Sequence, residues 1–283
     1  MSRVSVIFSF LRYEIKRAVA RKKVLALVAF TVLIDTVPYY ALSTSGTTII
    51  PAGDYPYIWA GGLLEPAATL FLNFITILIA AGAMSEEYEQ GTAELLLSKP
   101  VRRIDYFVGK YLGGYVLFLL ILALNLFLNV FSAYAAFGTQ LGLEVLPGIY
   151  LVQAFSGLLF FSIAFMMGEL IRRSSLSYIF ASAIFFSSTI IGAYMDLIYS
   201  ITGKAFYHNV HMYLPTTPVS SLPLQYVIPQ LPQISSVLEV IGVGGAAESS
   251  IVLSIVLILL YALGGIIVAV SYFSYADISR KVS

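Results

Sequence analysis

Six long apolar stretches limit what this chain can fold into more than any other feature. They lie near residues 24–43, 63–84, 112–136, 149–171, 176–199 and 250–273. About 20 helical residues cross a hydrocarbon core of about 30 Å, so each stretch can span a membrane. Only helices and closed barrels satisfy their backbone groups in lipid, and continuous apolar runs such as 116–130 lack the alternation of barrel strands. The sequence therefore predicts an all-α polytopic membrane protein with six transmembrane helices.

The overall composition supports this interpretation. Of the 283 residues, 59% are apolar and 11% are charged, whereas a soluble domain carries roughly 25% charged residues to solvate its surface. The net charge of +1 gives no basis for a nucleic-acid partner. The chain has no cysteine, which excludes disulfides, thiolate metal sites and cysteine nucleophiles.

The distribution of basic residues predicts the orientation of the chain. Loops on the cytosolic side of a membrane protein carry an excess of Lys and Arg. With six spans, all of the 16 Lys and Arg residues except Lys204 fall before the first span, in an inner loop or after the last span. We therefore expect a multi-pass protein of the cell (plasma) membrane with both termini in the cytosol.

Residues 1–23 form an amphipathic pattern ahead of the six-helix domain, which we assign to residues 24–283. Apolar residues recur at three- and four-residue spacing, at Val4, Ile7, Phe8, Leu11, Ile15 and Val19. The basic residues lie largely elsewhere on the helical wheel, at Arg3, Arg12, Lys16 and Arg17. This pattern predicts an interfacial elbow helix whose basic face meets anionic lipid. The alternative is a short soluble helix that packs on the cytosolic loops.

The segment 200–249 is expected to be an exoplasmic loop with its own structure. It contains five of the eleven prolines, at Pro215, Pro218, Pro223, Pro229 and Pro232. These prolines argue against one long helix, whereas the many apolar residues argue against a free polar loop. We expect short half-buried helices here. Earlier in the chain, Trp59 with Tyr55 and Tyr57 falls where an interfacial aromatic belt belongs.

The loop of residues 85–105, between the second and third spans, has the most specific pattern. Gly91 supplies a helix stop that tolerates positive φ, and Thr92 can N-cap a new helix with Glu94 in its first turn. Pro100 would end this helix, since it biases Lys99 out of α geometry. The prediction is a helix of about two turns on the membrane surface, with Leu95 to Leu97 exposed unless a partner covers them.

This loop resembles the first cytosolic loop of ABC-2-type ABC transporter permeases. The closest resemblance is to stand-alone permeases of the kind grouped with copper-enzyme maturation systems. The positions that match the family's motif are Glu86, Glu87, Gly91, Thr92, Glu94, Leu95, Leu96 and Pro100, followed by Gly109, Lys110 and Gly113. Arg102 and Arg103 lie where the family often has one basic residue, and the neutral Gln90 departs from the pattern. The order of elements along the whole chain is also similar to that family.

The resemblance implies a function and partners. The short helix would be the coupling helix that docks on a separate ATPase subunit, present in two copies. A second permease, identical or homologous, would complete the transporter, which is expected to be an exporter. ATP and magnesium would then bind the ATPase, and this chain would hold no cofactor. A rival hypothesis is a non-transporting membrane anchor or a force-transmitting subunit of a larger complex.

Enzyme and nucleotide sites are not supported by the sequence. Lys110 and Lys204 are followed by Tyr111 and Ala205 rather than by the Ser or Thr of a phosphate-binding loop. Glu86-Glu87 begins the pattern of a prenyl-protein protease family, but Gly91 stands where that pattern needs Arg. His208 and His211 are too few ligands for a closed zinc site, so we expect surface histidines and no metal centre.

Polar residues within the spans need a reason, because they are costly in lipid. Asp35, Asn73, Asn125 and Asn129 are candidates for a polar substrate pathway, although interhelical hydrogen bonds are the commoner use of such residues. Asp35 either belongs to a pathway, serves as a structural polar group, or meets water where the first apolar run ends early. Glu65, Glu169 and Asp196 lie near the ends of spans, where interfacial placement would explain them.

Overall fold

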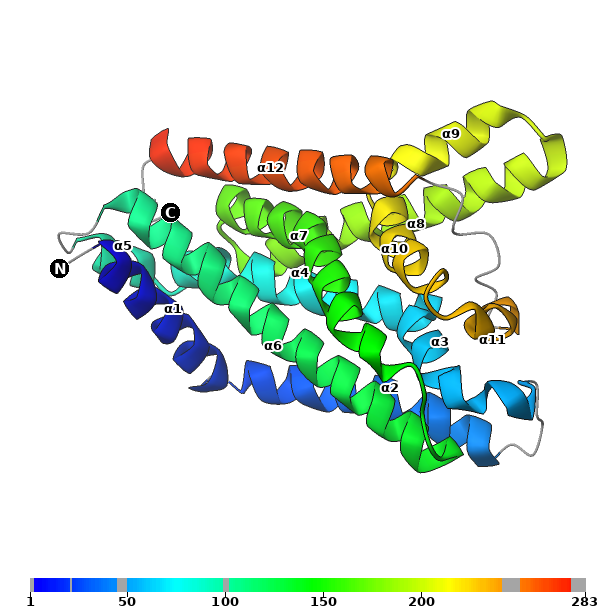
Figure 1. Cartoon of the computed structure of the whole chain (residues 1–283). Helices are drawn as coiled ribbons and strands as arrows, with labels where there is room; N and C mark the ends of the chain where they lie inside the picture. Colours follow the sequence, from blue (N-terminus) through cyan, green and yellow to red (C-terminus); the bar gives the residue numbers. More distant parts are fainter. Residues whose placement is uncertain (1–2, 21, 45–49, 99–101, 241–249, 276–283) are drawn as a thin grey trace.

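The computed structural model describes residues 3–20, 22–44, 50–98, 102–240 and 250–275, and these are helical with no strand among them. Six helices are long and apolar enough to cross a membrane: α2 (Lys23–Thr44), α4 (Pro66–Glu89), α6 (Arg103–Phe137), α7 (Leu146–Ile171), α8 (Ser174–Thr202) and α12 (Ile251–Tyr275). The predicted all-α, six-span fold is therefore confirmed. Figure 1 shows these helices running along one long direction of the molecule.

Shorter elements occupy the two ends of this bundle. The end that we call the α5 end holds α5 (Thr92–Leu97) and the beginning of α1 (Arg3–Ala20) (Figure 1). The opposite end, which we call the α11 end, carries 3₁₀ turns and short helices. These are η1 (Ala52–Tyr57), α3 (Ile58–Leu64), η2 (Leu143–Val145), α9 (Ala205–Tyr213), α10 (Thr216–Val227), η3 (Pro232–Ile234) and α11 (Ser235–Val240).

Helix α7 lies at the centre of the bundle and packs against both α4 and α12. Its approach to α4 is so close that a Cβ on Gly168 would lie 2.4 Å from the carbonyl oxygen of Ala81. On the other side, a Cβ on Gly265 of α12 would lie 3.1 Å from the backbone of Ser162. Small residues at such crossings allow dispersion contacts between backbones, which hold helices together where lipid removes the hydrophobic driving force.

The region with five prolines folds into α9, α10, η3 and α11, as its proline spacing predicts. Helix α10 is largely buried against α7 and α12, which explains why this segment is apolar. The aromatic belt predicted at Trp59 is wrong for that residue. Trp59 is fully buried, and its indole N–H donates to the carbonyl of Leu141 at 2.8 Å, so its polar group is satisfied inside the protein.

Candidate coupling site

The connection from α4 to α5 depends on the backbone of Gly91. This residue adopts a φ of +68°, and its N–H donates to the carbonyl of Tyr88 at 3.2 Å. Such a left-handed conformation costs a glycine little, because glycine has no Cβ. Gly91 therefore turns the chain, and α5 begins at the next residue. The predicted helix stop at Gly91 is confirmed.

Thr92 does not cap α5 as the sequence predicts. Gly91 occupies the N-cap position, and no side chain caps the helix. The Thr92 hydroxyl instead donates to the carbonyl of Glu87 at 3.3 Å, where it satisfies part of the end of α4. The reason is geometric. The turn at Gly91 already places Thr92 inside the helix, where a β-branched hydroxyl bonds to a preceding carbonyl.

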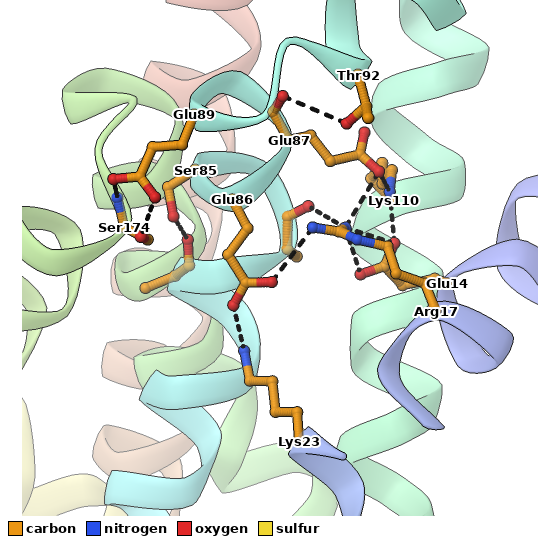
Figure 2. Close-up of polar contacts among 12 residues, drawn as sticks. Glu14, Arg17, Lys23, Ser85, Glu86, Glu87, Glu89, Thr92, Lys110 and Ser174 are labelled. Carbon is orange, nitrogen blue, oxygen red and sulfur yellow. Dashed lines mark hydrogen bonds and ion pairs between the residues drawn. The ribbon is translucent and has the colours of Figure 1, made fainter. Parts of the chain in front are cut away.

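Six charged side chains meet beside this turn, and we call them the charge cluster. They come from α1, α2, α4 and α6, and they are Glu14, Arg17, Lys23, Glu86, Glu87 and Lys110. Figure 2 shows them converging between the four helices. Three are acidic and three are basic, so the cluster is electrically neutral. Neutral, mutually paired charges are the form in which ions can be buried at a tolerable cost.

Glu87 is the most enclosed carboxylate of the cluster, with a side chain that is 0% exposed. It pairs with Lys110, whose side chain is also 0% exposed, and with Arg17 at 3.1 Å. The Tyr106 hydroxyl donates a further hydrogen bond to it. Glu87 therefore cannot touch a partner protein in this conformation. Its carboxylate attaches the end of α4 to α1 and α6, which explains why the motif has a glutamate at this position.

Arg17 joins α1 to this carboxylate group. Its guanidinium lies 3.3 Å from Glu14, 3.2 Å from Glu86 and 3.1 Å from Glu87. Burial disfavours the charged guanidinium, but the three carboxylates outweigh that effect and raise the pKa of Arg17 above its usual value. Arg17 thus stays charged and faces the protein, so its predicted contact with anionic lipid is wrong.

Helix α1 packs against α6 through small residues. A Cβ on Gly109 would lie 2.6 Å from the Cβ of Phe10, and one on Gly113 would lie 2.8 Å from the Cβ of Glu14. The two glycines thus permit the close approach of α1 to α6. The inward face of α1 thus carries Glu14 and Arg17, whereas the apolar side chain of Phe8 is 65% exposed.

Glu86 extends the cluster toward α2 and α8. Its carboxylate lies 3.0 Å from the ammonium of Lys23 and accepts a hydrogen bond from the Tyr178 hydroxyl. Lys23 also donates to the carbonyl of Leu78 at 2.8 Å. The first residue of α2 is therefore attached to the middle of α4, and a displacement of α4 must move or break this contact.

The neighbouring acidic residue, Glu89, attaches α4 to the start of α8. Its carboxylate accepts a hydrogen bond from the backbone N–H of Ser174 at 2.9 Å and another from the Ser174 hydroxyl. A carboxylate at a helix N-terminus satisfies unpaired N–H groups and is favoured by the helix dipole. Helices α4 and α8 are thus linked at the α5 end as well.

Glu169 connects α7 to α4. It is fully buried, and it accepts hydrogen bonds from the Tyr88 hydroxyl at 2.8 and 2.9 Å. Arg172, at the end of α7, lies 3.4 Å from it. Its position near the end of α7, beside Arg172, agrees with the prediction, and a tyrosine from α4 supplies the partner that water would otherwise provide.

Helix α5 has one exposed face, whereas the end of α4 that precedes it is held by the contacts described above. Ala93 is buried and Leu96 packs partly against the core, whereas Glu94, Leu95 and Ser98 are exposed, with Leu95 at 69%. Arg102 and Arg103, at the start of α6, are also exposed. Pro100 lies outside the described residues. The motif thus divides into a buried anchor, Glu87, and an exposed surface around Leu95.

Several residues of the site were not identified from the sequence as functional. They are Glu14, Arg17, Lys23, Tyr88, Tyr106 and Tyr178, and Lys110 was identified only as a position of the motif, without a role. Two signals point to part of this group. Glu14 is the one acidic residue in a strongly basic segment, and Lys110 lies between two glycines that permit close packing. The tyrosines give no such signal, since the chain has 20 of them.

The predicted pathway residues form two separate polar groups. Asp35 is buried and accepts hydrogen bonds from the Asn125 amide at 2.8 and 2.9 Å, while Asn129 accepts one from the Tyr39 hydroxyl at 2.7 Å. Asp35 therefore does not meet water at the end of a short span. Asn73 lies elsewhere and donates to the carbonyl of Thr69 at 2.9 Å.

Asn73 lines a pocket between α4, α6, α7 and α10. Gln153 and Ser156 also line it, and their buried side-chain oxygens have no hydrogen-bond partner among the residues that the structure describes. Buried polar atoms of this kind are normally satisfied by water. Of the predicted pathway residues, Asp35, Asn125 and Asn129 thus form contacts between α2 and α6. Asn73 lies beside the polar residues of α7.

The two histidines contact residues of α8. His211 pairs with Asp196 of α8, and the ring of His208 packs against Tyr199. Among the residues that the structure describes, no group of three or more His, Asp or Glu side chains could hold a metal ion. Asp196 is half exposed, so its placement near the end of a span agrees with its exposure.

Comparisons with known proteins identify the family to which this arrangement belongs. The family model described as "ABC-2 family transporter protein" matches residues 9–278, which include α5 and the whole charge cluster. The chain is also 26% identical over 192 residues to "Uncharacterized protein YhcI" of Bacillus subtilis. That match covers 60% of this chain and 61% of the relative, less than two thirds of its length. Because the family match spans nearly all of the sequence, the chain belongs to the ABC-2 family of transporter proteins.

Proposed function

We propose that this chain is the permease subunit of an ABC transporter and that α5 is its coupling helix. A separate ATPase subunit, in two copies, would bind ATP with magnesium and close in response to ATP, and a second permease would complete the assembly. The observation that carries the proposal is the division of the loop between its buried anchor at Glu87 and its exposed face at Glu94, Leu95 and Ser98.

A force applied to α5 would reach the rest of the bundle through the charge cluster. Glu87 joins α4 to α6 through Lys110 and to α1 through Arg17. Glu86 joins α4 to α2 through Lys23, and Glu89 joins it to α8 at Ser174. Coupling between distant sites requires packed elements of this kind with discrete arrangements. We assign export as the direction on the strength of the resemblance of the loop.

Docking of α5 can be tested by purifying the complex in lipid and measuring how much ATPase co-purifies with this chain. We expect Leu95→Asp to remove most of the bound ATPase. Docking excludes water from this face, so the new carboxylate would be buried without a paired cation. Leu143→Asp is the matched control, since Leu143 is an exposed leucine at the α11 end. Equal recovery of ATPase with both variants would refute docking through α5.

Transport itself is tested by ATP-dependent flux in proteoliposomes that contain permease and ATPase. Flux that needs both subunits, and that weakens with Leu95→Asp, would support the permease hypothesis. A complex that hydrolyses ATP and binds through α5 without moving any substrate would favour the force-transmitting alternative. Substrate accumulating on the side away from the ATPase would establish export.

A further inference from the structure

A pocket at the α11 end combines an acidic wall with an apolar one. It lies between α2, α3, α6 and α11, and the space inside it that is open to a water-sized molecule is about 50 Å³. Asp35, Glu65 and Asn129 contribute its polar lining, and Leu42, Ile58 and Val237 are among its apolar lining residues. No Lys, Arg or His lines it in the part of the chain that the structure describes. A bound group would therefore meet negative charge on one side and hydrocarbon on the other.

Asp35 is the residue that gives this pocket its chemical character. Its side chain is 1% exposed, and its two carboxylate oxygens accept hydrogen bonds from the Asn125 amide. Within the described ranges, neither Asp35 nor Glu65 takes part in an ion pair. The contrast with the charge cluster is informative, because every carboxylate there has a cation beside it. Burying a carboxylate without a cation is costly, so this arrangement suits a site whose cation arrives from outside.

An aromatic ring lies next to the carboxylate. Tyr39 lines the same pocket, and its hydroxyl donates to Asn129 at 2.7 Å. The backbone of α3 comes so close that a Cβ on Gly62 would lie 2.0 Å from the Tyr39 hydroxyl oxygen, so the ring is held in place. A fixed aromatic ring and a carboxylate together form a common environment for an ammonium group, through cation–π and ionic attraction.

We propose that this pocket binds the protonated amine of an amphipathic molecule, with the ammonium group against Asp35 and Tyr39. The hydrophobic part of the ligand would contact Leu42, Ile58 and Val237. An amine of this kind can partition into the membrane and reach a site between the helices of a bundle. That the ligand is the transported substrate rests on the proposed function, whereas binding itself does not.

The single tryptophan of the chain offers a local readout of binding. Trp59 is buried on α3, next to Ile58 and two residues before Gly61, both of which line the pocket. The experiment titrates purified protein in phospholipid nanodiscs with 2-phenylethylamine, which is protonated at neutral pH. 2-Phenylethanol is the matched uncharged probe of similar size. We expect a saturable change of Trp59 fluorescence with the amine and an affinity for the alcohol at least about tenfold weaker.

Variants then assign the charge that the amine recognises. Asp35→Asn keeps the size of the side chain and should weaken amine binding at least about tenfold while leaving the weak alcohol response unchanged. Glu144→Gln removes an exposed acidic group that does not line the pocket, and should bind the amine as the unmodified chain does.

Three results would overturn the proposal. They are equal affinity for amine and alcohol, a response that rises linearly without saturation, and full amine affinity in Asp35→Asn. The first two need no variant, so the proposal stays testable if Asp35→Asn does not fold. Neither ATP nor an ATPase is present in this titration. Failure of amine binding is therefore distinguishable from failure of α5 to dock on an ATPase.

Discussion

At the scale of single residues, the loop motif contains side chains with opposite surroundings. Glu87 is enclosed by cations and Tyr106, whereas Leu95 faces outward. The sequence places both in one motif and cannot separate them, because burial is decided by α1 and α6. The residue that contacts a partner and the residue that holds the helix in place therefore require different tests.

Removing the carboxylate of Glu87 should destabilise the protein. Glu87→Ala leaves Lys110 with Glu14 alone and takes one of three carboxylates from Arg17, and breaking a buried ion pair in this way costs about 3–5 kcal/mol. The measurement is thermal unfolding in detergent. Glu87→Gln with Lys110→Met should lose less stability than the sum of the two single changes, because the double variant removes both charges. Additive losses would show that the pair is not coupled.

Gly91 should be sensitive to backbone strain alone. A Cβ there would meet nothing within 4 Å, but its φ of +68° costs other residues roughly 1–2 kcal/mol. We expect Gly91→Ala to lower the melting temperature and to weaken the coupling of ATP hydrolysis to transport. Gly91→Asn should be milder, because Asn tolerates this conformation better. Variants that behave alike would show that the left-handed turn is not required.

At the scale of elements, one face of α1 packs against the helix bundle and another face is exposed. Its pattern predicts an amphipathic helix, and that helix exists. The pattern does not predict that Glu14 and Arg17 face inward, because their partners Glu87 and Lys110 lie far away in sequence. The same limit explains Glu169, whose partner Tyr88 comes from another helix. Apolar runs predict each span locally, whereas pairing between spans depends on tertiary structure.

Close packing between α1 and α6 can be tested at Gly109. In Gly109→Ala the new methyl would lie 2.6 Å from the Cβ of Phe10, so α1 must shift, and we expect lower thermal stability. Gly264→Ala is the matched control, because it lies in α12 with nothing within 4 Å of the new Cβ. There, alanine should be neutral or stabilising by up to about 1 kcal/mol. Similar melting temperatures for the two variants would contradict the packing described here.

At the scale of the whole molecule, the six-span fold could be predicted because lipid allows few alternatives to long apolar helices. The positions of α5 and of the turn at Gly91 followed from local signals. The pocket at Asp35 could be predicted only in part. Asp35, Asn125 and Asn129 stand out as polar residues in spans, but Glu65 and Val237 join them only through the packing of α3 and α11.

The absence of cysteine allows a clean test of orientation. Ser98→Cys and Leu143→Cys each introduce one exposed thiol, at the α5 end and the α11 end respectively. In intact cells, a membrane-impermeant maleimide should label Leu143→Cys and should reach Ser98→Cys only after the membrane is opened. Labelling of Ser98→Cys from outside would invert the orientation and remove α5 from contact with a cytosolic ATPase.

The neutrality of the charge cluster has a consequence for how this sequence can change over time. Six charges from four separate segments balance one another, so the loss of any one leaves an excess that the others cannot absorb. Tolerated changes should come in compensating sets, such as a neutral residue at Lys110 together with one at Glu14 or Glu87. Covariation of these positions among relatives would record that dependence, even between sequences too divergent to share a substrate.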